Sequence, residues 1–371
     1  MNIVIISPNQ NAYPETFIQA HKNRLAGTIH YLFGGDVPNK SDYTHQNIVS
    51  GSYFNKLGFK LRYRLFNSGL SKPQYALKMY LKKYNIQCVI AEYGTTGTQI
   101  YPVSEQLNTP LIVHFHGYDA SVHDVLENNR DDYRKMFAAA KFIIGVSQVM
   151  INKLKDLGAD ERKLVYNTYG PDDSFFKIKR NFTDKPVFFG VGRFVDKKAP
   201  YYTLIAFSKV VQRFPKAKLV MGGTGPLLET TMNLSRYLSI ENKVVFPGVL
   251  TPEGVKKHMS KATAFVQHSI TARNGDMEGT PVGILEASAA GLPVISTFHA
   301  GIPDVIIHEK TGLLCDEHDY AQMAENMLWV LEHPEQATAM GETGRKNIKE
   351  NFSMEKHIGK LNELIEKAVH G

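Results

Sequence analysis

Short apolar runs rich in β-branched residues alternate with longer amphipathic stretches from one end of the chain to the other. This alternation is typical of βαβ units, in which crossover helices join parallel strands. The expected strands of the first half are residues 3–6, 88–91, 111–113 and 142–146. Those of the second half are residues 187–191, 218–221, 244–246, 264–266 and 293–296. Because the rhythm occurs twice, the sequence predicts an α/β protein with two doubly wound parallel sheets.

The length of the chain favours two domains, because 371 residues exceed what one hydrophobic core usually serves. Residues 168–185 follow neither the helix nor the strand period and are rich in turn formers, so we expect the linker there. The sequence thus predicts Rossmann-like domains at residues 1–175 and 176–353, with a ligand at the carboxyl ends of their strands. Helices are expected near 319–333 and 335–351, and a last helix at 354–371 is expected to pack back on the first domain.

The composition argues against several classes of protein. Hydrophobic residues make up 43% of the chain and charged residues 21%, which is typical of a soluble globular protein. No apolar run approaches the roughly eighteen residues that a membrane span needs, and no signal pattern opens the chain, so we expect a cytoplasmic protein. Cys88 and Cys315 lie in different halves, which favours neither a disulfide framework nor a cysteine metal site.

The positive charge is concentrated in the first half of the chain. Residues 51–91 contain eight Lys and Arg residues and no acid, with aromatic residues between the first four of them. This pattern suits an anionic membrane surface, a lipid-linked phosphate or an acidic sugar. The alternative is a solvated helix face whose aromatic residues point into the core. Peripheral membrane contact through residues 53–83 is therefore one hypothesis, and nucleic acid is not expected as a partner.

Two glutamates, Glu278 and Glu286, lie eight positions apart around the expected start of a helix. Thr280 followed by Pro281 predicts an N-cap and a first helical residue. Glu278 would then precede the helix, and Glu286 would lie roughly 7 to 8 Å along its axis. Such a start would leave free backbone amides, which form an anion site between the two acids. These amides belong to Val282, Gly283 and Ile284.

A ligand built of hydroxyls, phosphates and hydroxyls, such as a nucleotide sugar, fits this layout. The alternative is an ordinary packing helix with two exposed acids. Arg193 and Lys198 follow the expected strand 187–191, and their charges suit a diphosphate that becomes more negative as it leaves. Gly192 follows the same strand, and Gly223 and Gly225 follow the expected strand 218–221; these glycines permit close approach of the backbone to a ligand. The alternatives are that Arg193 and Lys198 are ordinary surface cations and that the glycines form an ordinary turn.

In the first half, the expected strand from residue 111 runs into His114, His116 and Asp119. Alternation places the two histidines on one face, and Asp119 is a candidate to orient His116. A pair of satisfied histidines at a strand end is the alternative. No third metal ligand stands at a suitable spacing and no D-x-D motif occurs, so no metal is expected. The loop at residues 8–16 has no glycine, which argues against a dinucleotide fingerprint.

Five ordered motifs resemble those of family 4 glycosyltransferases, which are retaining enzymes of the GT-B fold. They are G-R-F-V-D-K-K, G-G-T-G-P, V-V-F-P-G, E-G-T-P-V-G-I-L-E-A and G-L-P-V-I-S-T-F-H-A-G-I-P-D. The similarity is dense over residues 187–316 and sparse in the first half, where P-E-T-F, H-G-Y-D and V-S-Q-V carry it. The stretch T-A-R-N-G-D-M-E-G-T-P is similar to exopolysaccharide and colanic-acid-type transferases.

The resemblance implies a role for each candidate residue. Arg193 and Lys198 would hold the donor diphosphate, and Glu286 would accept hydrogen bonds from the ribose hydroxyls. Glu278 would lie beside the transferred sugar, and His116 would contact the same sugar from the other domain. The glycines and the amides after Thr280 would contact sugar hydroxyls or phosphates. The chain departs from the family where Pro281 follows Thr280, because proline has no amide to donate, so one contact must be lost or shifted.

These observations predict a retaining glycosyltransferase that uses a nucleoside diphosphate sugar, with a UDP-sugar favoured, and no cofactor. Its expected acceptor is a saccharide or a lipid-linked saccharide, in cell-surface or exopolysaccharide synthesis. One alternative is a nucleotide-sugar epimerase or hydrolase on the same fold. Another is a non-catalytic protein that binds nucleotide sugars.

Overall fold

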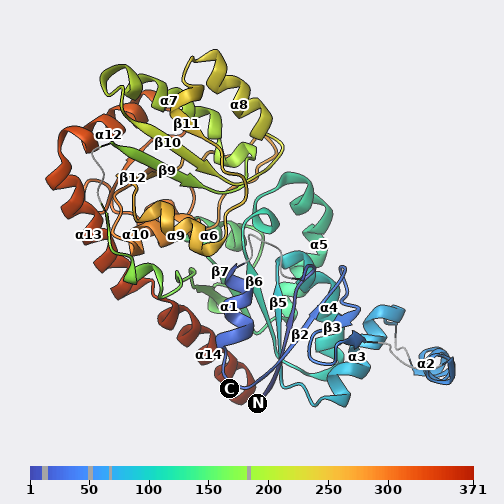
Figure 1. Cartoon of the computed structure of the whole chain (residues 1–371). Coiled ribbons are helices and arrows are strands. Elements are labelled where there is room, and N and C mark those ends of the chain that lie inside the picture. The colour runs from blue at the N-terminus through green and yellow to red at the C-terminus, as the bar shows by residue number, and fades with distance from the viewer. Residues whose placement is uncertain (11–15, 49–52, 67–68, 182–184) are drawn as a thin grey trace. The chain divides into compact units, whose positions relative to one another are not determined.

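The computed structural model describes residues 1–10, 16–48, 53–66, 69–181 and 185–371 (Figure 1). Contacts among them divide the chain into two compact units. Unit 1 comprises Met1–Asn167 with Ile358–Gly371, and unit 2 comprises Thr168–His357. The change of unit thus falls at the first residue of the segment in which we expect the linker, and residues 168–175 are grouped with unit 2. Most of the last helix is grouped with unit 1, from Ile358 onward.

Unit 1 is built on an eight-stranded sheet in the order β4-β3-β2-β1-β5-β6-β7-β8. All neighbouring strands from β2 to β8 pair in parallel, and β3 and β4 form an antiparallel edge. The strands are β1 (Asn2–Ile6), β2 (Thr28–Phe33), β3 (Lys40–Ser41), β4 (Gln46–Asn47), β5 (Cys88–Glu92), β6 (Leu111–Phe115), β7 (Phe142–Gly145) and β8 (Leu164–Tyr166). Strands β5 and β6 are buried along their whole length, as expected for central strands of a parallel sheet.

Helices accompany this sheet, and local sequence signals explain where some of them begin. The side chain of Ser71 accepts a hydrogen bond from the Gln74 amide while the Gln74 side chain accepts one from the Ser71 amide, which is a capping box at the start of α3. The helices of unit 1 are α1 (Thr16–Arg24), α2 (Tyr53–Phe66), α3 (Lys72–Lys83), α4 (Gly94–Leu107), α5 (His123–Ala139), α6 (Gln148–Asp156) and most of α14 (Met354–His370). In the described ranges, no helix is both long and apolar enough to cross a bilayer.

Unit 2 is built on a six-stranded parallel sheet in the order β11-β10-β9-β12-β13-β14. The strands are β9 (Val187–Val191), β10 (Lys218–Gly222), β11 (Val244–Val245), β12 (Ala264–Val266), β13 (Val294–Thr297) and β14 (Gly312–Cys315). Counted within the unit, the strand order is 3-2-1-4-5-6, and the order reverses between β9 and β12. Ligands of doubly wound sheets bind at the carboxyl ends of the strands at such a switch point.

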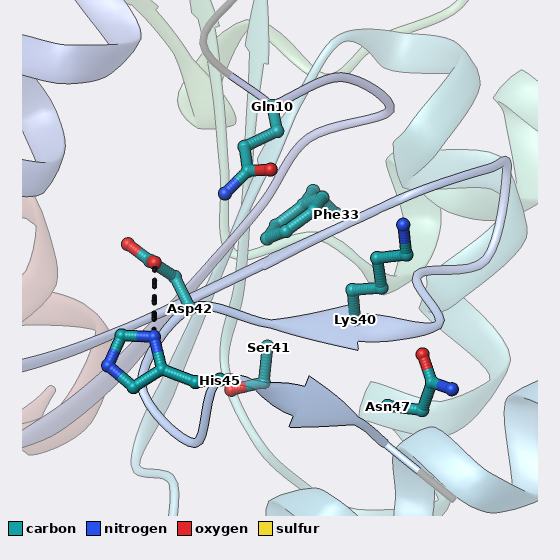
Figure 2. A pocket seen from close by; sticks show the side chains of 7 residues that line it. All are labelled: Gln10, Phe33, Lys40, Ser41, Asp42, His45 and Asn47. Carbon is teal, nitrogen blue, oxygen red and sulfur yellow. Dashed lines mark ion pairs between the residues drawn. The ribbon is translucent and has the colours of Figure 1, made fainter.

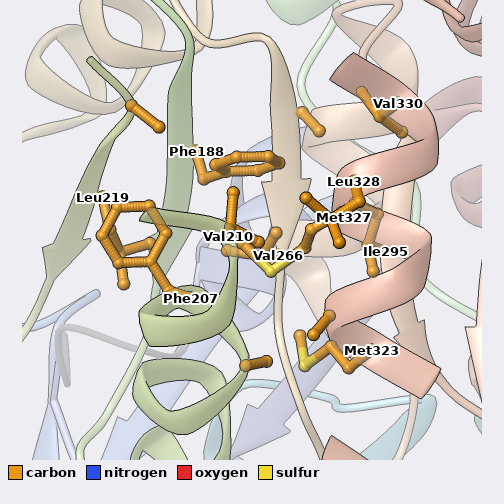
Figure 3. Packing of buried hydrophobic residues seen from close by; sticks show 14 of the residues in the cluster. Phe188, Phe207, Val210, Leu219, Val266, Ile295, Met323, Met327, Leu328 and Val330 are labelled. Atoms are coloured by element: carbon orange, nitrogen blue, oxygen red, sulfur yellow. The ribbon is translucent and has the colours of Figure 1, made fainter. Parts of the chain in front are cut away.

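Some helices of unit 2 and its sheet enclose an apolar core (Figure 3). The helices are α7 (Pro200–Arg213), α8 (Leu228–Tyr237), α9 (Pro252–Met259), α10 (Val282–Ala289), α11 (Ile302–Val305), α12 (Tyr320–Glu332) and α13 (Pro334–Asn351). Phe188 of β9 and Phe207 of α7 meet edge to face with ring centroids 6.2 Å apart, and Met327 of α12 joins the same cluster. This core supports the strand ends that carry the candidate site.

The structure contains every strand expected from the apolar runs, with ends shifted by at most two residues. The prediction missed β2, β3, β4, β8 and β14. Strands β3 and β4 have two residues each, too few to show a period. In β2 the apolar run is interrupted by His30, which is buried because its ring hydrogen-bonds to the Tyr80 hydroxyl at 3.0 Å. The expected helices at 319–333 and 335–351 are α12 and α13.

Candidate functional site

At the switch point of unit 2, the loops after β9 and β10 pack backbone against backbone. The Gly192 amide donates to the Gly222 carbonyl at 3.0 Å. A Cβ on Gly223 would lie 1.9 Å from the Gly192 carbonyl oxygen, and one on Gly225 would lie 2.4 Å from the Phe194 carbonyl oxygen. Glycine is therefore required at positions 223 and 225 for the loops to meet. A small cavity of about 30 Å³ remains between these strand ends.

Lys198 and Glu278 form an ion pair beside this cavity. The Lys198 Nζ lies 2.8 Å from Glu278 Oε1 and donates to Gln267 Oε1 at 3.3 Å. Both side chains are mostly buried, with 16% and 9% exposed. Burial raises the pKa of Glu278, but the charges of Lys198 and Lys197 outweigh burial and lower it to about 2. Glu278 is therefore a carboxylate at neutral pH. The structure thus brings together two residues that the sequence analysis placed in separate motifs.

Arg193 lies in the same loop as Lys198, but its side chain is exposed and forms no ion pair with any described residue. The guanidinium is thus available to a ligand at the end of β9. Lys197, which the sequence analysis did not select, is buried and only 6% exposed. Its Nζ donates to Asp276 Oδ1 at 2.9 Å and to the Met277 carbonyl at 3.0 Å, so it anchors the segment that precedes Glu278. Its position as the first lysine of the D-K-K motif was the available signal.

The start of α10 differs from the prediction. Pro281 is the N-cap, with φ of −65° and ψ of 117°, and the helix begins at Val282. The extended ψ of Pro281 delays the helix by one residue, so the predicted cap at Thr280 is wrong. The Ile284 amide donates to the Pro281 carbonyl at 3.0 Å, so the prediction that it is free is also wrong. The amides of Val282 and Gly283 have no hydrogen-bond partner among the described residues, and they form the positive end of the helix.

Glu286 lies one turn inside α10 and is partly buried. Burial, with a smaller contribution from nearby Asp172, raises the pKa of its carboxyl to about 8, although Lys256 opposes the change. The carboxyl is therefore protonated at neutral pH. Glu278 is thus negatively charged and Glu286 neutral on the two sides of the free amides, although they are the same type of residue.

In unit 1, the carboxylate of Glu92 at the end of β5 binds two histidines. The His21 Nδ1 lies 2.7 Å from Glu92 Oε1, and the His116 Nε2 lies 2.8 Å from Glu92 Oε2. Glu92 is fully buried, and burial alone would raise its pKa, but His21 and His116 hold the pKa well below the usual value. His114 lies farther away, with its Nδ1 3.8 Å from Glu92 Oε2.

Asp119 does not orient the His116 ring, so the prediction that it does is wrong. Its carboxylate accepts hydrogen bonds from the amides of His116, Gly117 and Gly94 at 2.9 to 3.0 Å. It thereby stabilises the turn that follows β6, while Glu92 takes the ring nitrogen. Glu92 was not among the residues predicted from the sequence. Glu92 could have been found as the acid that ends β5. It is paired in register with His114 of the neighbouring parallel strand β6.

The residues His21, Glu92 and His114 are of types that bind metals, and their ligand atoms lie within 4.8 Å of one another. However, the 2.7 Å between His21 and Glu92 is a hydrogen-bond distance. Two ligands of one tetrahedral zinc ion would lie about 3.3 Å apart. The group therefore has the geometry of a hydrogen-bond network.

A larger cavity of about 580 Å³ opens in unit 1 beside β2, β3 and β4 (Figure 2). Phe33, the last residue of β2, lines it together with Lys40 of β3. The His45 Nδ1 lies 4.0 Å from Asp42 Oδ1 at its edge. One aromatic ring among hydrogen-bonding groups of both charges suits a polar ligand. None of the residues selected from the sequence lines this cavity. Residues 11–15, which include Pro14 and Glu15 of the P-E-T-F motif, lie outside the described ranges.

The known proteins that this chain resembles are glycosyltransferases. Residues 172–347 match the family model described as glycosyl transferases group 1. WcaL of Escherichia coli (strain K12), named for colanic acid biosynthesis, is 28% identical over 243 residues, which cover 64% of this chain and 60% of WcaL. The amylovoran biosynthesis glycosyltransferase AmsK of Erwinia amylovora is 25% identical over 368 residues, which cover 96% of this chain and 90% of AmsK.

Solved structures show the fold. The crystal structure of HepE from Anabaena in complex with UDP superposes with a TM-score of 0.76 at 14% identity, over 100% of this chain and 99% of HepE. This similarity confirms the predicted GT-B fold.

Proposed function

Because residues 172–347 carry a glycosyl transferases group 1 domain on the GT-B fold, we propose that this glycosyltransferase takes a sugar from a nucleoside diphosphate sugar. The observation that carries the proposal is the arrangement at the switch point of unit 2. Lys198 and Glu278 form an ion pair there, and the free amides of Val282 and Gly283 and the carboxyl of Glu286 belong to the same segment. The cations and the free amides suit the phosphates of such a donor, and the acids on either side of the amides suit its hydroxyls.

Each residue takes a distinct part in this proposal. Lys198 and Arg193 bind the diphosphate together with the positive end of α10, and they stabilise the charge that grows as it leaves. Glu286 binds the ribose hydroxyls and Glu278 lies beside the transferred sugar. The glycines at positions 192, 223 and 225 keep the backbone close to the phosphates. The contact of His116 of unit 1 with the transferred sugar stays a prediction.

The proposed reaction retains the configuration of the sugar. The bond between the anomeric carbon and the phosphate oxygen breaks, and a bond to the acceptor oxygen forms on the same face. The acceptor proton passes to the leaving phosphate. A double displacement would instead need a nucleophile, and Glu278, the nearby candidate, is held by Lys198 at 2.8 Å. The fixed cations supply the electrostatic stabilisation that a metal ion supplies in other transferases, so we propose that none is required.

We propose UDP-sugars as donors because HepE was crystallised with UDP and with UDP-glucose. The proposed acceptor is a saccharide or a lipid-linked saccharide in cell-surface polysaccharide synthesis. The names of WcaL and AmsK, which refer to colanic acid and amylovoran biosynthesis, support this choice.

The basic segment of unit 1 supports a peripheral contact with the cytoplasmic face of a membrane. In α2, the apolar side chains of Leu61, Leu65 and Phe66 are 61%, 65% and 62% exposed. Phe59 and Tyr63 instead pack against Tyr75 of α3, with ring centroids 5.7 Å apart in both pairs. Exposed cations lie between the exposed apolar residues, and the segment has no acid, so this face suits anionic lipid. The cations are Lys60, Arg62 and Arg64.

Binding and turnover of nucleotide sugars test the proposal. Calorimetry in excess chelator should show binding of UDP, and an affinity loss beyond about tenfold relative to magnesium buffer, some 1.4 kcal/mol, would contradict metal independence. Purified protein with UDP-glucose should release UDP slowly by hydrolysis and faster with a suitable saccharide. A new sugar nucleotide would indicate an epimerase. Binding without any turnover would indicate a non-catalytic protein. Failure to bind UDP, GDP and ADP would refute the proposal.

A further inference from the structure

The loop after β13 holds the backbone around Glu278. The Glu278 amide donates to Nε2 of His299 at 3.1 Å. The Gly301 amide donates to the Gly279 carbonyl at 3.0 Å. The segment that carries the Glu278 carboxylate is thus held on one side by Lys197 and on the other by residues 299–301. Its position depends on a histidine side chain.

Hydrogen-bond donors and acceptors determine the protonation state of His299. A backbone amide can only donate, so Nε2 of His299 must be the accepting nitrogen. The ring proton then lies on Nδ1, which donates to Glu317 Oε1 at 2.6 Å. Glu317 also accepts hydrogen bonds from the amide and the hydroxyl of Thr271, at 2.7 and 3.3 Å. Burial raises the pKa of Glu317, but these hydrogen bonds lower it overall, so the carboxylate is ionised and selects the Nδ1–H tautomer.

We propose that His299 is a positioning residue for sugar transfer, and that its protonation at acid pH releases Glu278. A proton on Nε2 would face the Glu278 amide, so two donors would meet where a hydrogen bond now lies. The proposal rests on the proposed function, in which Glu278 lies beside the transferred sugar. His299 does not contact the reacting atoms; it acts through the backbone of Glu278.

The surroundings of His299 favour such a switch. The side chain is fully buried, so no water can replace the lost acceptor without rearrangement. Among the described residues, the titratable side chains that interact electrostatically with the ring include the carboxylates of Glu317 and Glu278, and His268 after β12. Burial lowers the pKa of His268 to about 4, so that ring stays neutral above this pH.

Backbone geometry supports a functional reason for this loop. Ala300, next to His299, has a φ of +46°, which is in the left-handed region that favours glycine. Residues held there by their surroundings cluster at functional sites. Here the strained residue joins the two that hold the Glu278 segment.

The first experiment compares pH profiles of kcat for UDP release from UDP-glucose. Wild-type kcat should fall at acid pH with the uptake of one proton. His299→Gln keeps an accepting oxygen that cannot be protonated, so it should lose this acid limb and keep part of the high-pH activity. His299→Leu has no acceptor, and its kcat should fall about tenfold to a hundredfold, as for a misplaced group. Glu317→Gln removes the charge but not the acceptor, and should move the acid limb about one pH unit lower.

His308→Gln is the matched control, because His308 also accepts a backbone amide, that of Leu314 at 3.0 Å, and its ring packs against Phe298 and not against the Glu278 segment. This variant should keep the wild-type acid limb. Thermal melts of every variant separate loss of folding from loss of positioning. An unchanged acid limb in His299→Gln, or wild-type kcat in folded His299→Leu, would overturn the proposal.

A second measurement does not depend on turnover. Nuclear magnetic resonance of protein labelled with ¹⁵N should show His299 protonated on Nδ1 at neutral pH, with its signals assigned by their loss in His299→Gln. The Glu278 amide resonance should shift at acid pH in the wild type and not in His299→Gln. A proton on Nε2 at neutral pH, or a Glu278 amide resonance that does not change at acid pH, would refute the proposed role of His299. If the hydrogen bond between His299 and the Glu278 amide titrates but no nucleotide sugar is turned over, only the proposed function fails.

Discussion

The carboxyl of Glu286 is expected to release a proton when a nucleoside diphosphate binds. In the free protein burial raises its pKa to about 8, so at pH 7 roughly ten molecules in eleven are protonated. Ribose hydroxyls that donate to Glu286 stabilise the ionised form and bring the pKa down. Binding and deprotonation are therefore linked. The affinity for UDP should rise with pH up to about 8 and then level off.

The size of the effect follows from the two pKa values. If the bound carboxyl returns to its ordinary value of 4.5, binding at pH 7 should release about 0.9 proton. Deprotonation would then cost about 1.4 kcal/mol at pH 7 and about 2.7 kcal/mol at pH 6. The dissociation constant for UDP should thus fall about ninefold between pH 6 and pH 7. Glu278, with a pKa lowered to about 2, is ionised throughout and contributes nothing over this range.

Calorimetry of UDP binding in buffers of different ionisation enthalpy measures the released protons directly. The terminal phosphate of UDP also titrates, with a pKa of about 6, so proton release by the wild type must be compared with that by a variant. Glu286→Gln keeps the shape and a carbonyl acceptor but cannot ionise. It should release about 0.9 proton less than the wild type at pH 7 and should lack the additional pH dependence. Equal proton release by the wild type and Glu286→Gln would refute the reasoning, and with it the ribose role of Glu286.

Three further predictions concern charge and surface. Arg193→Ala and Lys198→Ala should each lower kcat by about one and a half to three orders of magnitude, measured at saturating donor. In thermal melts, Arg193→Ala should have the wild-type melting temperature. Lys198→Ala should have a lower one, because it leaves the buried Glu278 carboxylate unpaired. Normal kcat in both would remove them from catalysis. Glu92→Gln should lower kcat about tenfold or more without weakening UDP binding, because it disturbs His116. This loss should disappear in a His116→Ala background, whereas an additive loss would show that Glu92 acts elsewhere. In vesicle co-sedimentation, wild-type binding should rise with anionic lipid, fade with salt and be reduced by Phe66→Ser; indifference to lipid charge would leave only a solvated face.

Periodicity and local motifs determined much of this protein in advance. The apolar runs predicted the parallel strands, because a strand buried on both faces needs a continuous apolar sequence. The motifs placed Lys198, Glu278 and Glu286 at strand and helix ends, because the positions of turns and helix starts are local properties. Local reasoning already failed at Pro281, whose ψ of 117° delays the helix by one residue.

The tertiary structure alone decided which charges meet and in what state. Lys198 pairs with Glu278, and Glu92 with His21, through contacts between residues 80 and 71 positions apart. The order of the parallel strands brings such residues to one edge of a sheet, and local sequence periodicity does not predict that order. Burial and neighbouring charge then give two glutamates of one motif pKa values of about 2 and about 8. The sequence determined the residue types, whereas the fold determined their partners, and the charge of a buried group depends on its partners.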